Sequence, residues 1–169
     1  VKNAVSIPVI AANLIRSPEQ AESQLNEYLL VKAPPACGKS RAMMFVALDK
    51  LQNQDIKKVI VAVPEKTIGR SFDDTNLKDY GFFANWKVAP YFNLCSGNEA
   101  EKKKRFFEFI DPGCKNKILV CTHSTLRNAT KELKDEQLND CLFGIDEYHH
   151  SSADVGNGLG ELIRRLIAR

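Results

Sequence analysis

The sequence predicts an α/β fold in which a parallel β-sheet is covered by helices on both faces. Short apolar runs alternate along the chain with amphipathic stretches of helical spacing, which is typical of βαβ units. The apolar runs lack polar alternation, as expected for strands buried on both faces. Right-handed crossovers would place helices on both sides of such a sheet, and ligands bind at the carboxyl ends of its strands.

The expected strands are apolar runs bounded by turn residues. Val59–Val63 is the strongest, because it is rich in β-branched residues and is closed by Pro64. Val88–Leu94 is a weaker candidate. In chain order, we expect strands at Tyr28–Lys32, Val59–Val63, Val88–Leu94, Lys117–Cys121 and Leu142–Ile145.

The expected helices place their apolar residues at helical spacing. In the first of them, Met43, Met44, Ala47 and Leu48 can share one face. A proline and a glycine after Asp111 stop the second. The expected helices are Ser40–Leu51, Asn98–Ile110, Ser124–Leu133 and Glu161–Ala168.

Composition indicates one ordinary globular domain, which we place at residues 1–169. Hydrophobic residues make up 44% and charged residues 27% of the chain, which excludes a disordered or low-complexity protein. The net charge of +3 is too small to indicate nucleic-acid binding by itself. No window reaches the roughly 18 apolar residues of a membrane span. The chain begins with Val1 and ends within an expected helix, so we expect a fragment of a longer protein.

The five cysteines are scattered and include no Cys-x-x-Cys pair. The residues around Cys95, Cys121 and Cys141 are apolar or strand-like, so these thiols are interpreted as small core residues. An odd number without a disulfide pattern indicates a reducing compartment, and we expect a cytoplasmic protein.

A phosphate-binding motif follows the first expected strand. The segment Ala33-Pro-Pro-Ala-Cys-Gly-Lys-Ser40 has the spacing of a P-loop, with Ala33 at the first glycine position. Prolines have no N–H, so the amides of residues 36–40 must cradle the phosphates. Lys39 would reach the β- and γ-phosphates, and the Ser40 hydroxyl would hold Mg²⁺. The nucleotide-contacting set is Ala36, Cys37, Gly38, Lys39 and Ser40, with Arg41 and Ala42 in the following helical turn.

Two carboxylates follow the last expected strand, in Asp146-Glu-Tyr-His-His150. Asp146 would hold the Mg²⁺ through its ligand water, and Glu147 would orient and activate the attacking water. Together with Lys39, they form the expected catalytic group.

These two motifs resemble those of superfamily 2 helicases and translocases of the DExH kind. Asp146–His150 is similar to the variant in the motor subunits of type I and type III restriction enzymes. Two weaker segments occur in the same order: Val59–Ile68 resembles motif Ia, and Ile118–Leu126 resembles motif Ib. The resemblance covers most of the chain and implies the first RecA-like domain of a P-loop ATPase.

The resemblance implies ATP and Mg²⁺ as cofactors and a nucleic acid, DNA more than RNA, as partner. A second RecA-like domain in the same chain would supply arginine fingers, and nuclease or methyltransferase subunits are further expected partners. The isolated fragment would hydrolyse ATP slowly or not at all, because such an arginine contributes about 10³–10⁵ in rate. Contacts to the nucleic-acid backbone are expected from Pro64, Lys66, Arg70, Thr122, Ser124 and Thr125.

Several positions allow two interpretations. Ala36 stands where the family has glycine, so its Cβ would restrict the loop if the position needs a positive φ. Gln20, or else Gln24, is the candidate adenine reader, and either is equally well a helix-surface residue. His149 either couples the γ-phosphate site to nucleic acid or only satisfies a nearby carbonyl. Lys66 and Arg70 are alternatively a solvated helical turn.

Two further clusters are interpreted as structural. The run Lys102–Arg105 is expected on the wet face of a helix. Phe82, Phe83 and Trp86 are expected in the core or in domain packing rather than stacked on bases. Two other functions remain open: an ATP-gated binding switch without translocation, and a P-loop kinase, against which the Asp-Glu-x-His sequence weighs.

Overall fold

The computed structural model describes residues 36–64, 71–147 and 158–167. Within these residues lies a four-stranded sheet in the order β2-β3-β1-β4, and every pairing in it is parallel. In the register, Val59 lies opposite Ile118 and Ala62 opposite Ile145. The strands are β1 (Lys58–Val63), β2 (Asn93–Leu94), β3 (Ile118–Thr122) and β4 (Cys141–Ile145). The expected strand Tyr28–Lys32 falls outside the described residues.

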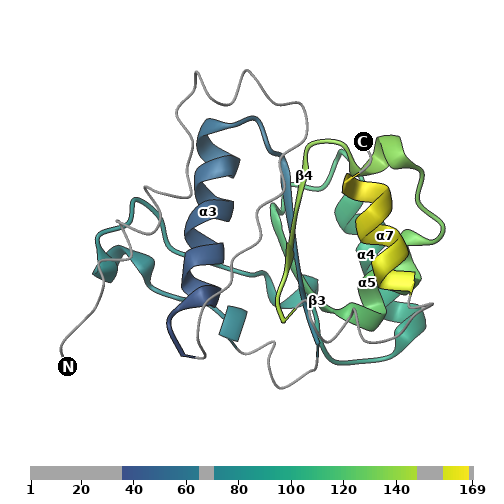
Figure 1. The fold of residues 1–169 in the computed structure, drawn as a ribbon, viewed down its shortest axis with the longest axis horizontal. Helices are drawn as coiled ribbons and strands as arrows, with labels where there is room; N and C mark the ends of the chain where they lie inside the picture. Colours follow the sequence, from purple (N-terminus) through teal and green to yellow (C-terminus); the bar gives the residue numbers. More distant parts are fainter. Residues whose placement is uncertain (1–35, 65–70, 148–157, 168–169) are drawn as a thin grey trace.

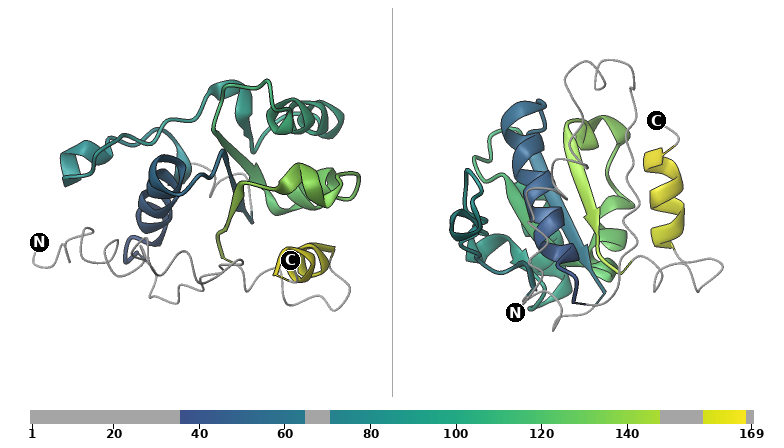
Figure 2. Two further views of the ribbon diagram at one scale, coloured as in Figure 1. Left: turned by 90° about the horizontal axis from the view of Figure 1, so that it is seen from above. Right: turned by 60° about the vertical axis from the view of Figure 1, so that its left-hand side comes forward.

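Helices cover both faces of this sheet, as the sequence predicts (Figures 1 and 2). Helix α3 lies on one face, and α4, α5 and α7 lie on the other. The helices are α3 (Lys39–Asn53), α4 (Glu99–Ile110), α5 (His123–Thr130) and α7 (Gly158–Ile167). Shorter 3₁₀ turns occupy Leu77–Tyr80, Pro90–Phe92 and Asp135–Leu138.

Strand β1 lies between β3 and β4 in the described sheet and contributes to the apolar cores on both of its faces. All six of its residues are buried. Val59, Val61 and Val63 face α3, whereas Ile60 and Ala62 face α4 and α5. This alternation follows from the two-residue period of a strand, and it explains why the run has no polar position.

The expected strand Val88–Leu94 is wrong over most of its length. Only Asn93–Leu94 pairs with β3. Pro90 has no N–H for a ladder and begins a 3₁₀ turn. The amide of Val88 donates instead to Oδ1 of Asp74, at 2.9 Å.

The run Lys102–Arg105 is only partly exposed to solvent. The prediction that the whole run lies on a solvated helix face is therefore wrong in part. Lys102 is 3% exposed, and its Nζ donates to Glu99 one turn earlier, at 2.7 Å. Arg105 stacks over the ring of Tyr91 at 4.6 Å. Long basic side chains cover apolar surface with their stems while the head finds a polar partner. Lys104 is exposed, as expected.

The interpretation of the aromatic cluster and the thiols is largely confirmed. Trp86 is fully buried, and its indole N–H donates to the carbonyl of Phe72 at 2.9 Å. Phe83 is the exception among the aromatic residues, with 41% of its surface exposed, and among the three thiols Cys141 is only half-buried. Burial raises the pKa of the Cys95 thiol to about 11 and raises the pKa of Cys121 well above its usual value. Both are therefore inert core thiols.

Gly144 in β4 allows α3 to pack closely against the sheet. A Cβ at this position would lie 2.5 Å from Sδ and 3.2 Å from Cγ of Met43, and 3.6 Å from a methyl group of Val61. We expect Gly144→Ala to lower the free energy of unfolding by about 1–3 kcal/mol through overpacking. Chemical denaturation measures this change.

Gly160 in α7 provides a matched control for that substitution. A Cβ added there would meet nothing within 4 Å, and alanine is a better helix former than glycine. Gly160→Ala should leave the free energy of unfolding unchanged or slightly raised. Equal stabilities of the two variants would show that Gly144 is not needed for the contact between α3 and β4.

Candidate functional site

The N-terminus of α3 is prepared to receive an anion. Gly38 precedes the helix in a left-handed conformation, with φ 93° and ψ 21°, and as a glycine it has no side chain to cap the first turn. The first amides of a helix have no partner within the helix, and the dipole favours negative charge there. Helix α3 is 15 residues long, so this end offers a phosphate both N–H donors and a favourable field.

Ala36 adopts a positive φ of 57°. The position therefore has the left-handed conformation that glycine adopts freely. The Cβ of Ala36 thus restricts the loop, as the sequence analysis expects for a positive φ. For an L-residue, this conformation costs about 1–2 kcal/mol. The cost arises directly in the loop that would cradle phosphates, where strain is often retained for function.

The two acidic residues lie in a tight turn at the end of β4. The amide of Asp146 donates to the carbonyl of Ala62 at 2.9 Å, which continues the pairing with β1 by one residue. The amide of Glu147 donates to Oδ1 of Asp146 at 3.1 Å. Glu147 itself has a positive φ of 49°. The Asp146 carboxylate is thus held by a backbone N–H, and both acidic residues lie at the carboxyl edge of the sheet.

The charged groups around Asp146 come from its own turn, from the phosphate loop and from α5. It is buried, with 7% of its surface exposed. Burial and the neighbouring charge of Glu147 raise the pKa of Asp146 above its ordinary value, whereas the positive charges of Lys39 and His123 act to lower it. Lys39 and Asp146 are far apart in sequence, and the packing of α3 against β4, with Met43 beside Gly144, brings their two elements together.

His123 is a site residue that the sequence analysis did not single out. It is the first residue of α5. Its Nε2 lies 2.9 Å from the carbonyl oxygen of Asp146. A carbonyl only accepts, so Nε2 carries the proton and donates. The signal in the sequence was its position directly after a buried strand, at the edge where Asp146 lies.

The hydroxyls predicted to contact nucleic acid are mostly engaged within the protein. Thr122 caps α5 and accepts from the amide of Thr125 at 3.3 Å. Its hydroxyl also lies 2.9 Å from the hydroxyls of Ser124 and Thr125. Thr122 and Thr125 are buried, whereas Ser124 is exposed. Of the three, only Ser124 presents its side chain to a partner.

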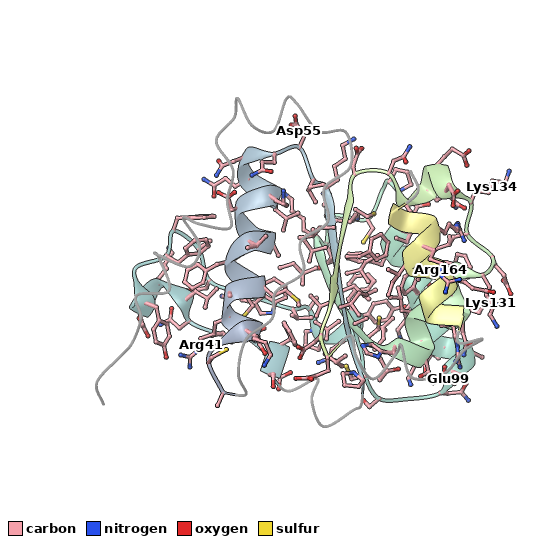
Figure 3. The ribbon with its side chains drawn as sticks, viewed as in Figure 1. Arg41, Asp55, Glu99, Lys131, Lys134 and Arg164 are labelled. Atoms are coloured by element: carbon pink, nitrogen blue, oxygen red, sulfur yellow. The ribbon has the colours of Figure 1, made fainter. Side chains whose placement is uncertain are left out.

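Arg41 lies at the N-terminal end of α3, and Asp55 lies beyond its other end (Figure 3). The Arg41 guanidinium stacks over the ring of Tyr80 at 4.5 Å. Tyr80 is itself 44% exposed. Ala42, the next residue, is buried in the core, so of these two positions only Arg41 is available to a ligand.

The remaining expected site residues divide into one that the structure describes and several that it does not. Pro64, at the end of β1, is described and half-buried. Outside the described residues lie Ala33–Pro35, Gln20, Gln24, Lys66, Arg70, His149 and His150. Among the described residues, no three His, Cys, Asp or Glu side chains gather as a metal site. In the same part of the chain, no helix is both long and apolar enough to cross a membrane.

A helix-start phosphate loop beside strand-end carboxylates on a parallel sheet defines the P-loop nucleoside triphosphatases with a RecA-like fold. The family model described as "Type III restriction enzyme, res subunit" matches residues 9–168, and the chain belongs to this family.

Two curated proteins are similar to this chain in sequence. "Putative ATP-dependent helicase YeeB" of Bacillus subtilis (strain 168) is 56% identical over 146 residues, covering 86% of this chain and 24% of its own length. "Putative helicase 22" of Sulfolobus islandicus filamentous virus (isolate Iceland/Hveragerdi) is 32% identical over 131 residues, covering 77% of this chain and 21% of its own length. The chain thus spans about a quarter of these relatives. No solved structure matches significantly.

Proposed function

We propose that residues 1–169 form the first RecA-like domain of an ATP-dependent helicase or translocase that moves on nucleic acid. One observation carries this proposal: helix α3, which begins at Lys39, packs with Met43 against Gly144 of β4, the strand that leads into the buried Asp146. Such a pairing supplies a phosphate cradle and a cation ligand at a single site. The names of both relatives agree with it.

The residues present suit ATP with Mg²⁺. The amides of residues 36–40 would receive the phosphates, and Lys39 would neutralise the β- and γ-phosphates. Ser40 and Asp146 would hold the Mg²⁺, which when bound withdraws charge from the transferring phosphate. A buried carboxylate beside a second carboxylate is costly to ionise, and a cation at this point removes that cost. Glu147 would orient the attacking water.

The nucleic-acid contacts would lie at the same edge of the sheet. Val63 at the end of β1 pairs with Thr122 at the end of β3. The segments that follow, beginning at Pro64 and His123, therefore start side by side. We infer a backbone-binding strip from Pro64, Lys66, Arg70 and Ser124, with Thr122 and Thr125 shaping the turn, because cations and hydroxyls contact phosphates without reading bases.

Movement would require parts beyond this chain. ATP bound between Lys39 and a second RecA-like domain would close the two domains, and hydrolysis would reopen them. We propose His149 as a coupling residue, Arg41 and Gln20 as further nucleotide contacts, DNA as the track and the cytoplasm as location. Nuclease or methyltransferase subunits are proposed partners.

The alternative is an ATP-gated switch that binds nucleic acid without moving along it. Displacement of streptavidin from end-biotinylated DNA by the full-length protein separates the two. A motor displaces streptavidin only with hydrolysable ATP. A switch binds the DNA in an ATP-dependent manner and leaves the streptavidin in place, which would overturn the motor proposal.

A further inference from the structure

We propose that His123 is a positioning residue that joins the nucleic-acid-facing start of α5 to the turn that carries Asp146 and Glu147. This inference rests on the proposed function of the same site. His123 lies within the segment Ile118–Leu126 that resembles motif Ib, where the sequence analysis gives it no role of its own.

His123 holds the peptide unit between the two acidic residues. The carbonyl of this peptide, from Asp146, accepts from the imidazole at 2.9 Å. The N–H of the same peptide, from Glu147, donates to Oδ1 of Asp146 at 3.1 Å. Rotation of this peptide would change ψ of Asp146 and φ of Glu147, and it would turn the N–H of Glu147 away from Oδ1 of Asp146. The Asp146 carboxylate holds the N–H side of this peptide, and the His123 imidazole holds the C=O side.

The turn held in this way has little other freedom. The amide of Asp146 is tied to Ala62 of β1 at 2.9 Å, so the residue is anchored on both sides. Glu147 adopts a positive φ of 49°, which surrounding contacts must maintain. A donor on the Asp146 carbonyl is therefore well placed to hold Glu147 in its working orientation.

The other side of the connection is the first turn of α5. His123 lies between Thr122, which caps the helix, and Ser124, whose hydroxyl is exposed. Thr122 pairs with Val63, next to Pro64. A phosphate backbone bound along this strip would contact the turn that holds the imidazole, and any movement of α5 would be passed to the Asp146 carbonyl.

The far end of α5 is also anchored to the chain that follows the acidic turn. Arg165 of α7 donates to the carbonyls of Leu133 at 2.8 Å and Thr130 at 3.2 Å, and pairs with Asp135. The start of α5 is thus bonded to Asp146 through His123, and the end of α5 and the segment after it are bonded to Arg165 of α7.

The test compares His123→Ala and His123→Gln in the full-length protein, with ATP hydrolysis measured alone and with saturating single-stranded or duplex DNA or RNA. In the alanine variant, we expect the stimulated kcat to fall about 10- to 100-fold, because small misplacements of catalytic groups have effects of this size. The KM for ATP should stay within about twofold of the wild type. Glutamine places an amide donor near the position of Nε2 and should restore much of the rate.

Asn128→Ala, an exposed position on the same helix, is the matched control and should retain the wild-type rates. A melting curve for each variant identifies loss of folding, and the glutamine variant remains informative if alanine does not fold. A His123→Ala protein that folds and keeps wild-type stimulation overturns the inference, as does a folded His123→Gln protein no more active than a folded alanine variant. A wild-type enzyme that no polymer stimulates would instead contradict the proposed function.

Discussion

Replacing Lys39 by alanine is expected to lower nucleic-acid-stimulated ATP hydrolysis by about 10²–10³-fold, the cost of removing one group that stabilises transition-state charge. Lys39 is the first residue of α3, which packs against β4, and β4 leads into the buried Asp146. Without Lys39, a bound γ-phosphate would lose the lysine that we propose to neutralise it. The measurement is phosphate release by the full-length protein at saturating polymer.

Lys50 provides the control, since it is the same residue type in the last turn of the same helix. Its Nζ donates to Gln54 at 2.7 Å, far from the phosphate loop. Lys50→Ala should hydrolyse ATP at the wild-type rate. If Lys39→Ala kept more than about a tenth of the wild-type rate, Lys39 would not be the phosphate-binding lysine that this site requires.

Replacing Glu147 by glutamine is expected to lower hydrolysis by about 10²–10⁴-fold, the usual contribution of a positioned general base. Binding of ATP should persist, because glutamine keeps the shape of the side chain and leaves Lys39, Ser40 and Asp146 in place. Equilibrium binding of a fluorescent ATP analogue, measured beside the hydrolysis rate, separates the two effects. The variant should accumulate in the ATP-bound form.

Two further variants test whether the effect is specific to Glu147. Glu136→Gln, at an exposed glutamate before β4, should leave both rate and affinity unchanged. Asp146→Asn should weaken binding of Mg²⁺·ATP as well as hydrolysis, because Asp146 is proposed to hold the metal. If Glu147→Gln turned over at the wild-type rate, the water-activating role would belong to another residue.

The sequence predicts the buried strands well because their signal is local. Val59–Val63 and Leu142–Ile145 agree with β1 and β4 to within one residue at each end. A continuous apolar run favours a strand with buried faces whatever surrounds it. Val88–Leu94 failed because Pro90 interrupts the ladder, and because Asp74, distant in sequence, takes the amide of Val88.

The site residues differ in the same way: some have a local sequence signal, and others depend on contacts between distant parts of the chain. The phosphate loop and the acidic pair have short motifs, so Lys39 and Asp146 are recognisable from spacing alone. His123 is not, because its partner is a backbone carbonyl brought near by the pairing of β1 with both β3 and β4. The burial of Thr122 and Thr125 is equally invisible in the sequence, since it depends on how α5 packs.

The most direct test of this account is the rate of ATP hydrolysis by the full-length protein, alone and with single-stranded DNA, duplex DNA or RNA, using Lys39→Ala as the blank. The account predicts a Lys39-dependent rate that rises with at least one of these polymers, which then identifies the track. A Lys39-dependent rate indifferent to all three would contradict a nucleic-acid motor and leave the nucleotide switch.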